Sequence, residues 1–160
     1  MPERLSLRTP QDTEAFGHAL GEALRAGDLV LLAGPLGAGK TVLTRGIAAG
    51  LGVRGRVSSP TFVIAREHPA GPRGIPLIHV DAYRLGGDLD ELDDLDLDSE
   101  LVDSAVVVEW GEGSADRLTP DHLVVRLTRH PDDTRTLTLE PHGTWVDRVD
   151  FPFPRPNPVP

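Results

Sequence analysis

Hydrophobic residues in this chain gather into short runs that predict buried strands. Residues 29–33 (Leu-Val-Leu-Leu-Ala) and 105–108 (Ala-Val-Val-Val) are continuous apolar runs, a pattern typical of strands covered on both faces of a sheet. Shorter apolar stretches at residues 5–7, 62–65 and 77–80 predict three more strands, the first of them at a sheet edge. A Gly/Pro-rich loop connects the last two of these stretches.

Two helices are predicted between the strands. Residues 16–24 place apolar side chains at helical spacing, and the Thr-Pro-Gln-Asp sequence at residues 9–12 is typical of a helix start. Gly27 is the expected C-terminal stop of this helix. Residues 42–51 predict a second helix, closed by Gly52.

The order of these elements predicts one α/β domain. Residues 123–127 and 136–139 alternate between apolar and polar side chains around a Pro-Asp-Asp turn, which predicts a C-terminal β-hairpin. We therefore expect a P-loop NTPase-like sheet flanked by helices, with this hairpin, over residues 1–150. Every second residue of 151–160 is Pro, so we expect a disordered, extended tail outside the domain.

Composition excludes several classes of protein. The chain has no Cys, which excludes disulfides, thiolate metal sites and cysteine nucleophiles. Its first residues lack an apolar signal region, and no apolar run approaches the roughly 20 residues that span a bilayer. We expect a cytoplasmic protein with no membrane association.

The net charge of −9 is concentrated in one segment. Residues 88–103 contain seven Asp, two Glu and no Lys or Arg, and the remaining 16 acids are balanced by 16 basic residues. Tight binding to a nucleic-acid backbone requires a basic surface instead, so direct binding of tRNA or DNA by this chain alone is not expected.

The most specific motif follows the first buried strand and opens the second helix. Residues 34–41, Gly-Pro-Leu-Gly-Ala-Gly-Lys-Thr, match the P-loop pattern G-x-x-x-x-G-K-[ST] at every fixed position. Backbone N–H groups of such a loop hold phosphate oxygens, the Lys side chain reaches the β- and γ-phosphates, and the Thr hydroxyl binds Mg²⁺. Lys40 is the only lysine in the chain, and its compact ammonium group suits a crowded phosphate site. The predicted nucleotide-binding residues are Gly34, Pro35, Leu36, Gly37, Ala38, Gly39, Lys40, Thr41 and Val42.

A P-loop also requires an acid at the end of a neighbouring strand to hold Mg²⁺ directly or through water. Glu109 ends one predicted strand and Asp81 ends another, and the sequence leaves open which of them contacts the metal and which orients water. We predict Lys40, Asp81 and Glu109 as catalytic residues. Thr41, Glu109 and Asp81 are the predicted metal ligands, with ATP and Mg²⁺ as cofactors.

Several further residues carry weaker signals. Thr61 is a candidate switch residue that senses Mg²⁺ or the γ-phosphate, and an ordinary turn hydroxyl explains it equally well. Tyr83 and Arg84 offer a phosphate or partner contact, and Trp110 belongs either to an interface or to the core. His79 reads as a strand histidine satisfied inside the fold rather than as a metal ligand. Arg135 and the region near Thr9 are guesses for adenine contacts.

In order, these motifs resemble the bacterial TsaE family, also called YjeE. The resemblance covers about residues 9–139 and rests on the P-loop, Ser59-Pro60-Thr61-Phe62, His79-Val80-Asp81-Ala82-Tyr83-Arg84-Leu85 and Glu109-Trp110. It implies the ATPase of the machinery that makes N6-threonylcarbamoyladenosine (t6A) in tRNA, working with the TsaB and TsaD subunits and meeting tRNA only through that complex.

For single residues, the resemblance implies that Lys40 and Thr41 hold the phosphates and Mg²⁺ and that Glu109 assists the metal. It further implies that Asp81, Thr61 and Trp110 support hydrolysis or coupling. The chain departs from the family pattern at Val42, where a second Thr is common, and within residues 96–98, where a Gly is usual. Neither departure touches Lys40 or Thr41.

Three functions stay open at this point. The favoured one is a coupled ATPase, slow without its partners, for which residues 88–103 offer a docking surface or simply a solvated helix face. The alternative is a small P-loop kinase acting on a nucleoside or another metabolite, with Asp81 as base and Arg84 as phosphate clamp. Against the kinase, the sequence shows no Arg-rich lid. A third is a nucleotide-gated binding module with negligible turnover.

Overall fold

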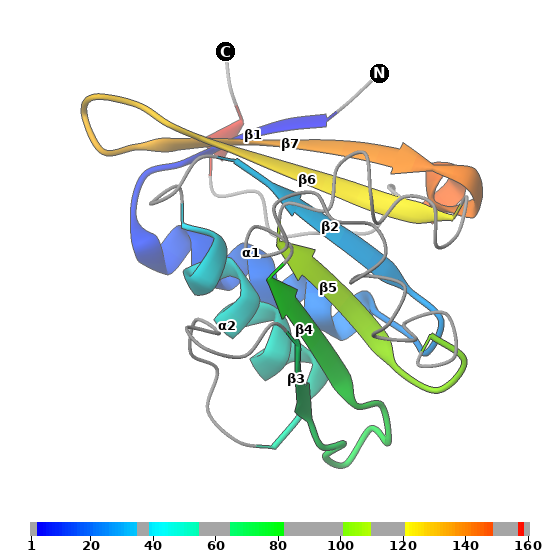
Figure 1. Cartoon of the computed structure of the whole chain (residues 1–160). Helices are drawn as coiled ribbons and strands as arrows, with labels where there is room; N and C mark the ends of the chain where they lie inside the picture. The colour runs from blue at the N-terminus through cyan, green and yellow to red at the C-terminus, as the bar shows by residue number, and fades with distance from the viewer. Residues whose placement is uncertain are drawn as a thin grey trace.

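A single mixed sheet organises the chain, with its two described α-helices side by side against one face (Figure 1). The computed structural model describes residues 3–34, 39–54, 65–81, 101–109, 121–148 and 157–158. Its strands are β1 (Glu3–Leu7), β2 (Leu29–Ala33), β3 (Ala65–His68), β4 (Leu77–Asp81), β5 (Ala105–Glu109), β6 (His122–Arg129), β7 (Arg135–His142) and β8 (Asn157–Pro158). The helices are α1 (Pro10–Ala23), α2 (Lys40–Leu51) and the 3₁₀ helix η3 (Gly143–Arg148).

The strand order is β3-β4-β5-β2-β6-β7-β1-β8. The four central strands β4, β5, β2 and β6 run parallel, whereas β3 at one side and β7 and β1 at the other are antiparallel to their neighbours. Every residue of β2 and of β5 is buried, which confirms the two continuous apolar runs as central strands. The predicted α/β class and the β6–β7 hairpin are also confirmed.

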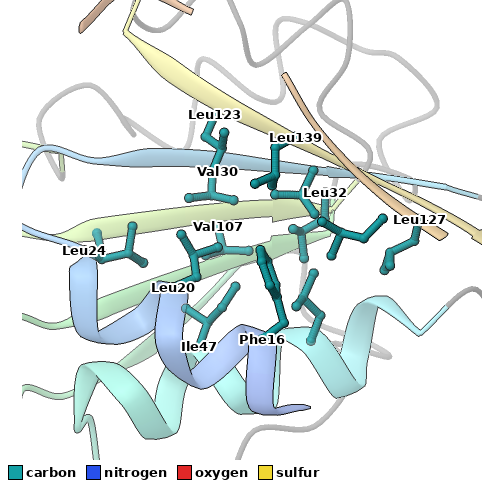
Figure 2. Packing of buried hydrophobic residues seen from close by; sticks show 14 of the residues in the cluster. Phe16, Leu20, Leu24, Val30, Leu32, Ile47, Val107, Leu123, Leu127 and Leu139 are labelled. Carbon is teal, nitrogen blue, oxygen red and sulfur yellow. The ribbon is translucent and has the colours of Figure 1, made fainter. Parts of the chain in front are cut away.

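Alternate residues of the central strands face two separate hydrophobic clusters. Val30, Leu32 and Val107 face the helices and pack with Phe16, Leu20 and Ile47 (Figure 2). Leu29, Leu31 and Val106 face the other side, where they belong to a second cluster that also contains Leu101. Burial of each large apolar side chain contributes about 1.5–3 kcal/mol, so the helix-facing cluster is the main source of stability in the described part of the chain.

Helix α1 begins as predicted and ends earlier than predicted. The side chain of Thr9 caps it by accepting a hydrogen bond from the N–H of Asp12 at 3.1 Å, and Pro10 is its first residue. The prediction of Gly27 as the stop was wrong, because the helix ends at Ala23 with Leu24 as an extended, fully buried C-cap. Core packing of Leu24 overrides the glycine signal, and Gly27 instead lies in the turn that leads into β2.

The other boundaries differ from the predictions by a few residues. Helix α2 starts at Lys40, two residues before the predicted start, and Gly52 closes it as expected, in the left-handed conformation with φ 78°. The strand predicted over residues 62–65 is described from Ala65 onwards, and residues 62–64 lie outside the described part.

The predicted edge strand β1 has neighbours on both sides. It pairs with β7 along its whole length and, through two residues, with β8 from the proline-rich tail. A Pro-containing strand fits this position because Pro cannot donate to a second neighbour. In the described residues no helix is long and apolar enough to cross a membrane.

Candidate functional site

The carboxyl ends of three parallel strands meet at one edge of the sheet. The register pairs Asp81 at the end of β4 with Glu109 at the end of β5, and Glu109 with Leu32 of β2. Gly34, the first residue of the P-loop motif, follows β2 directly. Open α/β sheets bind ligands at the carboxyl ends of such strands, so the topology brings the motif and the two acids to a common edge.

The described ends of the P-loop have the backbone that the motif requires. Gly34 and Gly39 have positive φ angles of 148° and 108°, which residues with a Cβ rarely adopt. Helix α2 begins immediately after Gly39, with its first backbone hydrogen bond from Leu43 to the carbonyl of Gly39 at 2.9 Å. The N–H groups of the first turn of α2 and the positive end of its dipole therefore lie at the loop.

Lys40 points back across the loop rather than into solvent. Its ammonium donates a hydrogen bond to the carbonyl oxygen of Gly34 at 2.8 Å, and the residue is only 7% exposed. A buried ammonium group is costly unless it is paired, and a phosphate is an anion that such a group binds strongly. Thr41, the predicted Mg²⁺ ligand, is the second residue of α2 and is half-buried.

Glu109 is a buried acid beside a buried histidine. Oε1 of Glu109 lies 3.6 Å from Nε2 of His79, and the two side chains are 7% and 0% exposed. Within the described residues, Oε1 of Glu109 and both ring nitrogens of His79 have no hydrogen-bond partner. A buried unsatisfied group costs about 1–3 kcal/mol, so such groups gather where a function requires them.

His79 thus differs in part from its prediction. It is a buried strand residue, as expected, and it is not satisfied within the described fold. Sequence reasoning missed its position beside Glu109. The signal that could have found it is the alternation of side chains along paired strands, because His79 pairs in register with Val107, two residues before Glu109 on the same face of β5.

The structure brings some predicted residues together and leaves others outside its described part. Gly34, Gly39, Lys40, Thr41, Val42 and Glu109 are described, as is the backbone of Asp81. Predicted residues that lie outside are Pro35, Leu36, Gly37, Ala38, Thr61, Tyr83, Arg84 and Trp110, and residues 88–100 of the acidic segment lie outside as well.

The two guesses for adenine contacts have different surroundings. Arg135 starts β7 next to the P-loop, since a Cβ built on Gly39 would lie 3.8 Å from Nε of Arg135. Thr9 is the N-cap of α1, and its hydroxyl oxygen accepts the capping hydrogen bond from Asp12.

The described residues fit a magnesium ion that is held together with a phosphate ligand. Among them, no group of three or more His, Cys, Asp or Glu side chains could hold a metal by itself. Mg²⁺ is usually bound by one or two carboxylates plus phosphates and water, rather than by a cage of protein side chains. The unpaired Oε1 of Glu109 is an oxygen ligand of the kind that Mg²⁺ prefers.

Comparison with known proteins gives consistent matches. The family model described as "Threonylcarbamoyl adenosine biosynthesis protein TsaE" matches residues 7–137. The tRNA threonylcarbamoyladenosine biosynthesis protein TsaE of Streptomyces coelicolor is 64% identical over 119 residues, which cover 74% of this chain and 80% of that protein. The protein of the same name from Mycobacterium bovis is 56% identical over 135 residues, or 80% of each chain.

A solved structure agrees with these sequence matches. The crystal structure of YdiB from Bacillus subtilis superposes with a TM-score of 0.71 at 32% identity, over 92% of each chain. On the family match and these identities, the chain belongs to the TsaE family.

Proposed function

We propose that this protein binds ATP with Mg²⁺ and hydrolyses it to drive the enzyme cycle of tRNA t6A modification, with TsaB and TsaD as its partners. The observation that carries the proposal is a buried Lys40 at the P-loop, together with an unsatisfied Glu109 at the end of the strand beside β2. Membership of the TsaE family supplies the tRNA modification in which this chemistry would act. A cytoplasmic location is part of the same proposal.

Each residue has a defined part in the proposed site. The N–H groups at the start of α2 and the Lys40 ammonium bind the phosphates. Lys40 would then donate to a phosphate oxygen in place of the carbonyl oxygen of Gly34. When bound, magnesium would neutralise negative charge on the phosphates. Thr41 and Glu109 would hold it, with Asp81 either sharing that task or orienting the attacking water. Thr61, Tyr83, Arg84 and Trp110 stay predicted coupling residues.

The charge of the chain favours an indirect relation to tRNA. Outside residues 88–103 the formal charges balance, so the chain as a whole offers no excess of positive charge for a phosphate backbone. A subunit that works through TsaB and TsaD has no need of such a surface. The acidic segment then serves as a candidate docking surface for those partners.

The test compares ATP affinity and turnover in the purified chain, alone and with TsaB and TsaD. We expect weak turnover alone and a rise with the partners. Lys40→Ala should lower ATP affinity and turnover by about 100-fold or more, because it removes a buried charge from the phosphates. Glu109→Gln should keep ATP affinity within a few-fold of wild type. Its turnover should fall by about 100-fold or more, as in Lys40→Ala.

Arg45→Ala is the matched control, because Arg45 is an exposed cation on the same helix, and its removal should leave both quantities unchanged. If turnover is the same with and without TsaB and TsaD, and phosphate is transferred to an added metabolite, the kinase would be favoured. No turnover under any condition would leave a nucleotide-gated binding module.

A further inference from the structure

The C-terminal hairpin places an arginine beside the first turn of α2. Arg135 is the first residue of β7, 95 positions after Lys40 in the numbering, yet its Nε lies 3.8 Å from where a Cβ on Gly39 would be. Its side chain is only 14% exposed. The guanidinium group therefore lies against the backbone of the P-loop at the point where helix α2 begins.

The hairpin turn fixes the direction of this side chain. Asp133 adopts the left-handed conformation with φ 72°, and its carbonyl oxygen accepts a hydrogen bond from NH1 of Arg135. Asp132 stabilises the same turn, accepting hydrogen bonds from the backbone N–H of Thr134 at 3.1 Å and from its hydroxyl at 2.6 Å. Arg135 is thus held before any ligand arrives, which lowers the entropic cost of binding.

The carboxylate of Asp133 is shared between two arginines. Its Oδ1 lies 3.3 Å from NH1 of Arg135 and 2.7 Å from NH2 of Arg129, the residue opposite Arg135 in the register. One negative charge between two positive charges leaves this trio with a net charge of +1. Asp132, in the same turn, brings the formal charge of the four groups to zero, so Asp133 orients Arg135 without being its exclusive ion-pair partner.

Three positive features consequently converge on one place. The start of α2 carries about half a positive charge from its dipole, Lys40 adds an ammonium, and the first turn of α2 contains no acidic residue. Arg135 adds a guanidinium whose planar fork matches a phosphate group. An anion bound beside the start of α2 would be stabilised by each of these positive groups.

A second feature of the same edge also indicates a ligand. Oε1 of Glu109 is buried and has no hydrogen-bond partner within the described residues, and Glu109 is paired in register with Leu32, two residues before the loop. An unsatisfied acid at one strand end and two cationic side chains at the start of α2 fit a metal-bound phosphate chain.

We propose that Arg135 binds the phosphate groups of the nucleotide, from the hairpin side of the P-loop. This inference rests on the proposed nucleotide binding and adds a binding residue that lies outside the P-loop motif and the strand-end acids. Because Arg135 comes from β7, the C-terminal hairpin becomes part of the site and not only a scaffold for the sheet.

The test measures the dissociation constants of ATP and of inorganic tripolyphosphate, both with Mg²⁺, for wild type, Arg135→Gln and Arg129→Gln. Arg129 is the matched control, because it sits opposite in the same hairpin and binds the same aspartate, and its side chain is 53% exposed. We expect Arg135→Gln to weaken both ligands about tenfold to a hundredfold, the loss typical of a charge-assisted hydrogen bond. Arg129→Gln should stay within about twofold of wild type on the same scale.

Three outcomes would overturn the inference while leaving the proposed function intact: unchanged binding in Arg135→Gln, equal weakening in both variants, or weaker ATP with unchanged tripolyphosphate, which would assign Arg135 to the base or sugar. Wild-type protein that binds neither ligand would overturn both proposals. Should melting curves show that the Gln variant is unfolded, Arg135→Met, which keeps the apolar stem, tests the same outcomes.

Discussion

At the scale of single residues, burial decides how each charged or polar group behaves. Lys40 is buried against a carbonyl oxygen, and Glu109 is buried beside His79 with an unsatisfied oxygen. The exposed pair His18–Glu22 has the same two residue types at 2.8 Å, but water surrounds both side chains. Buried charges interact more strongly with a ligand than exposed charges do, so we expect the proposed chemistry at the strand ends.

His68 in β3 gives a prediction about pH. It is buried, and burial first, then the nearby His79 and Arg66, hold its pKa below the ordinary value of 6.5. Below pH 6.5 the unfolded chain takes up a proton that the folded His68 resists, so the folded state loses stability as the pH falls through this range. In His68→Gln, that part of the pH dependence should disappear.

The measurement is the free energy of unfolding by urea at several pH values between about 8 and 5. Wild type should lose stability relative to His68→Gln as the pH falls below 6.5, and the difference should be constant above it. A difference that does not change with pH would show that His68 titrates alike in the folded and unfolded chains.

At the scale of elements, the contact between α1 and α2 depends on four glycines. Gly17 and Gly21 of α1 face Gly46 and Gly50 of α2, and a Cβ on any of them would collide with a backbone carbonyl oxygen of the other helix. Arg73 supports the same contact by donating hydrogen bonds to the carbonyls of Gly21 and Leu24, each at 2.7 Å. This close approach holds α2, and with it the P-loop, against the rest of the fold.

Gly50→Ala tests this contact, because the direction of the change in the free energy of unfolding depends on whether the helices are in close contact. In an isolated helix the change should stabilise by about 0.5–1 kcal/mol, because Ala has the higher helix propensity. Here the new Cβ would meet the carbonyl oxygen of His18 and lie 2.9 Å from the N–H nitrogen of Glu22. We therefore expect a loss of about 1–3 kcal/mol in the free energy of unfolding.

The neighbouring exposed residue provides the control for Gly50→Ala. Ala49→Gly changes helix propensity in the opposite direction and touches no helix contact, so it should cost about 0.5–1 kcal/mol. Urea denaturation of both variants measures the two values. A Gly50→Ala protein as stable as wild type would mean that the helices can move apart without cost.

At the scale of the whole molecule, strand order joins segments that are distant in the sequence. Strand β6 lies beside β2, so the β6–β7 hairpin is carried to the side of the P-loop opposite β5 (Figure 1). Acids at the ends of β4 and β5 approach from one side of β2, and Arg135 approaches from the other. The site is therefore assembled by the sheet as a unit.

The proline-rich tail gives a prediction at this scale. Its contact with the sheet within the described residues is the pairing of β8 with Leu5 and Ser6 of β1. Because so short a strand adds little, deletion of residues 151–160 should change the free energy of unfolding by less than about 1 kcal/mol. ATP affinity should stay within about twofold, since the tail pairs with β1 at the sheet edge and not with β2.

Urea denaturation and an ATP titration of the shortened chain measure both effects. Agreement with the full chain would support a domain over residues 1–150, as the sequence predicts. A shortened protein that loses more than about 2 kcal/mol, or binds ATP differently, would make the tail an integral part of the domain.

The sequence by itself determined the features that depend on neighbouring residues. The apolar runs of β2 and β5, the cap at Thr9 and the stop at Gly52 are local patterns, and each was confirmed. The P-loop motif is local as well, and its nucleotide binding stays a prediction. The prediction at Gly27 was wrong because it also used a local pattern. The helix ends at Ala23 instead, and Leu24 is buried in the core.

Only the tertiary structure decided which distant residues meet. The position of His79 beside Glu109, the four-glycine contact between α1 and α2 and the approach of Arg135 to Gly39 all depend on strand order, register and helix crossing. Hydrophobic periodicity fixes which face of an element is buried, but it does not fix which element covers that face. For that physical reason the sequence predicted the motif, whereas the groups that surround it emerged from the fold.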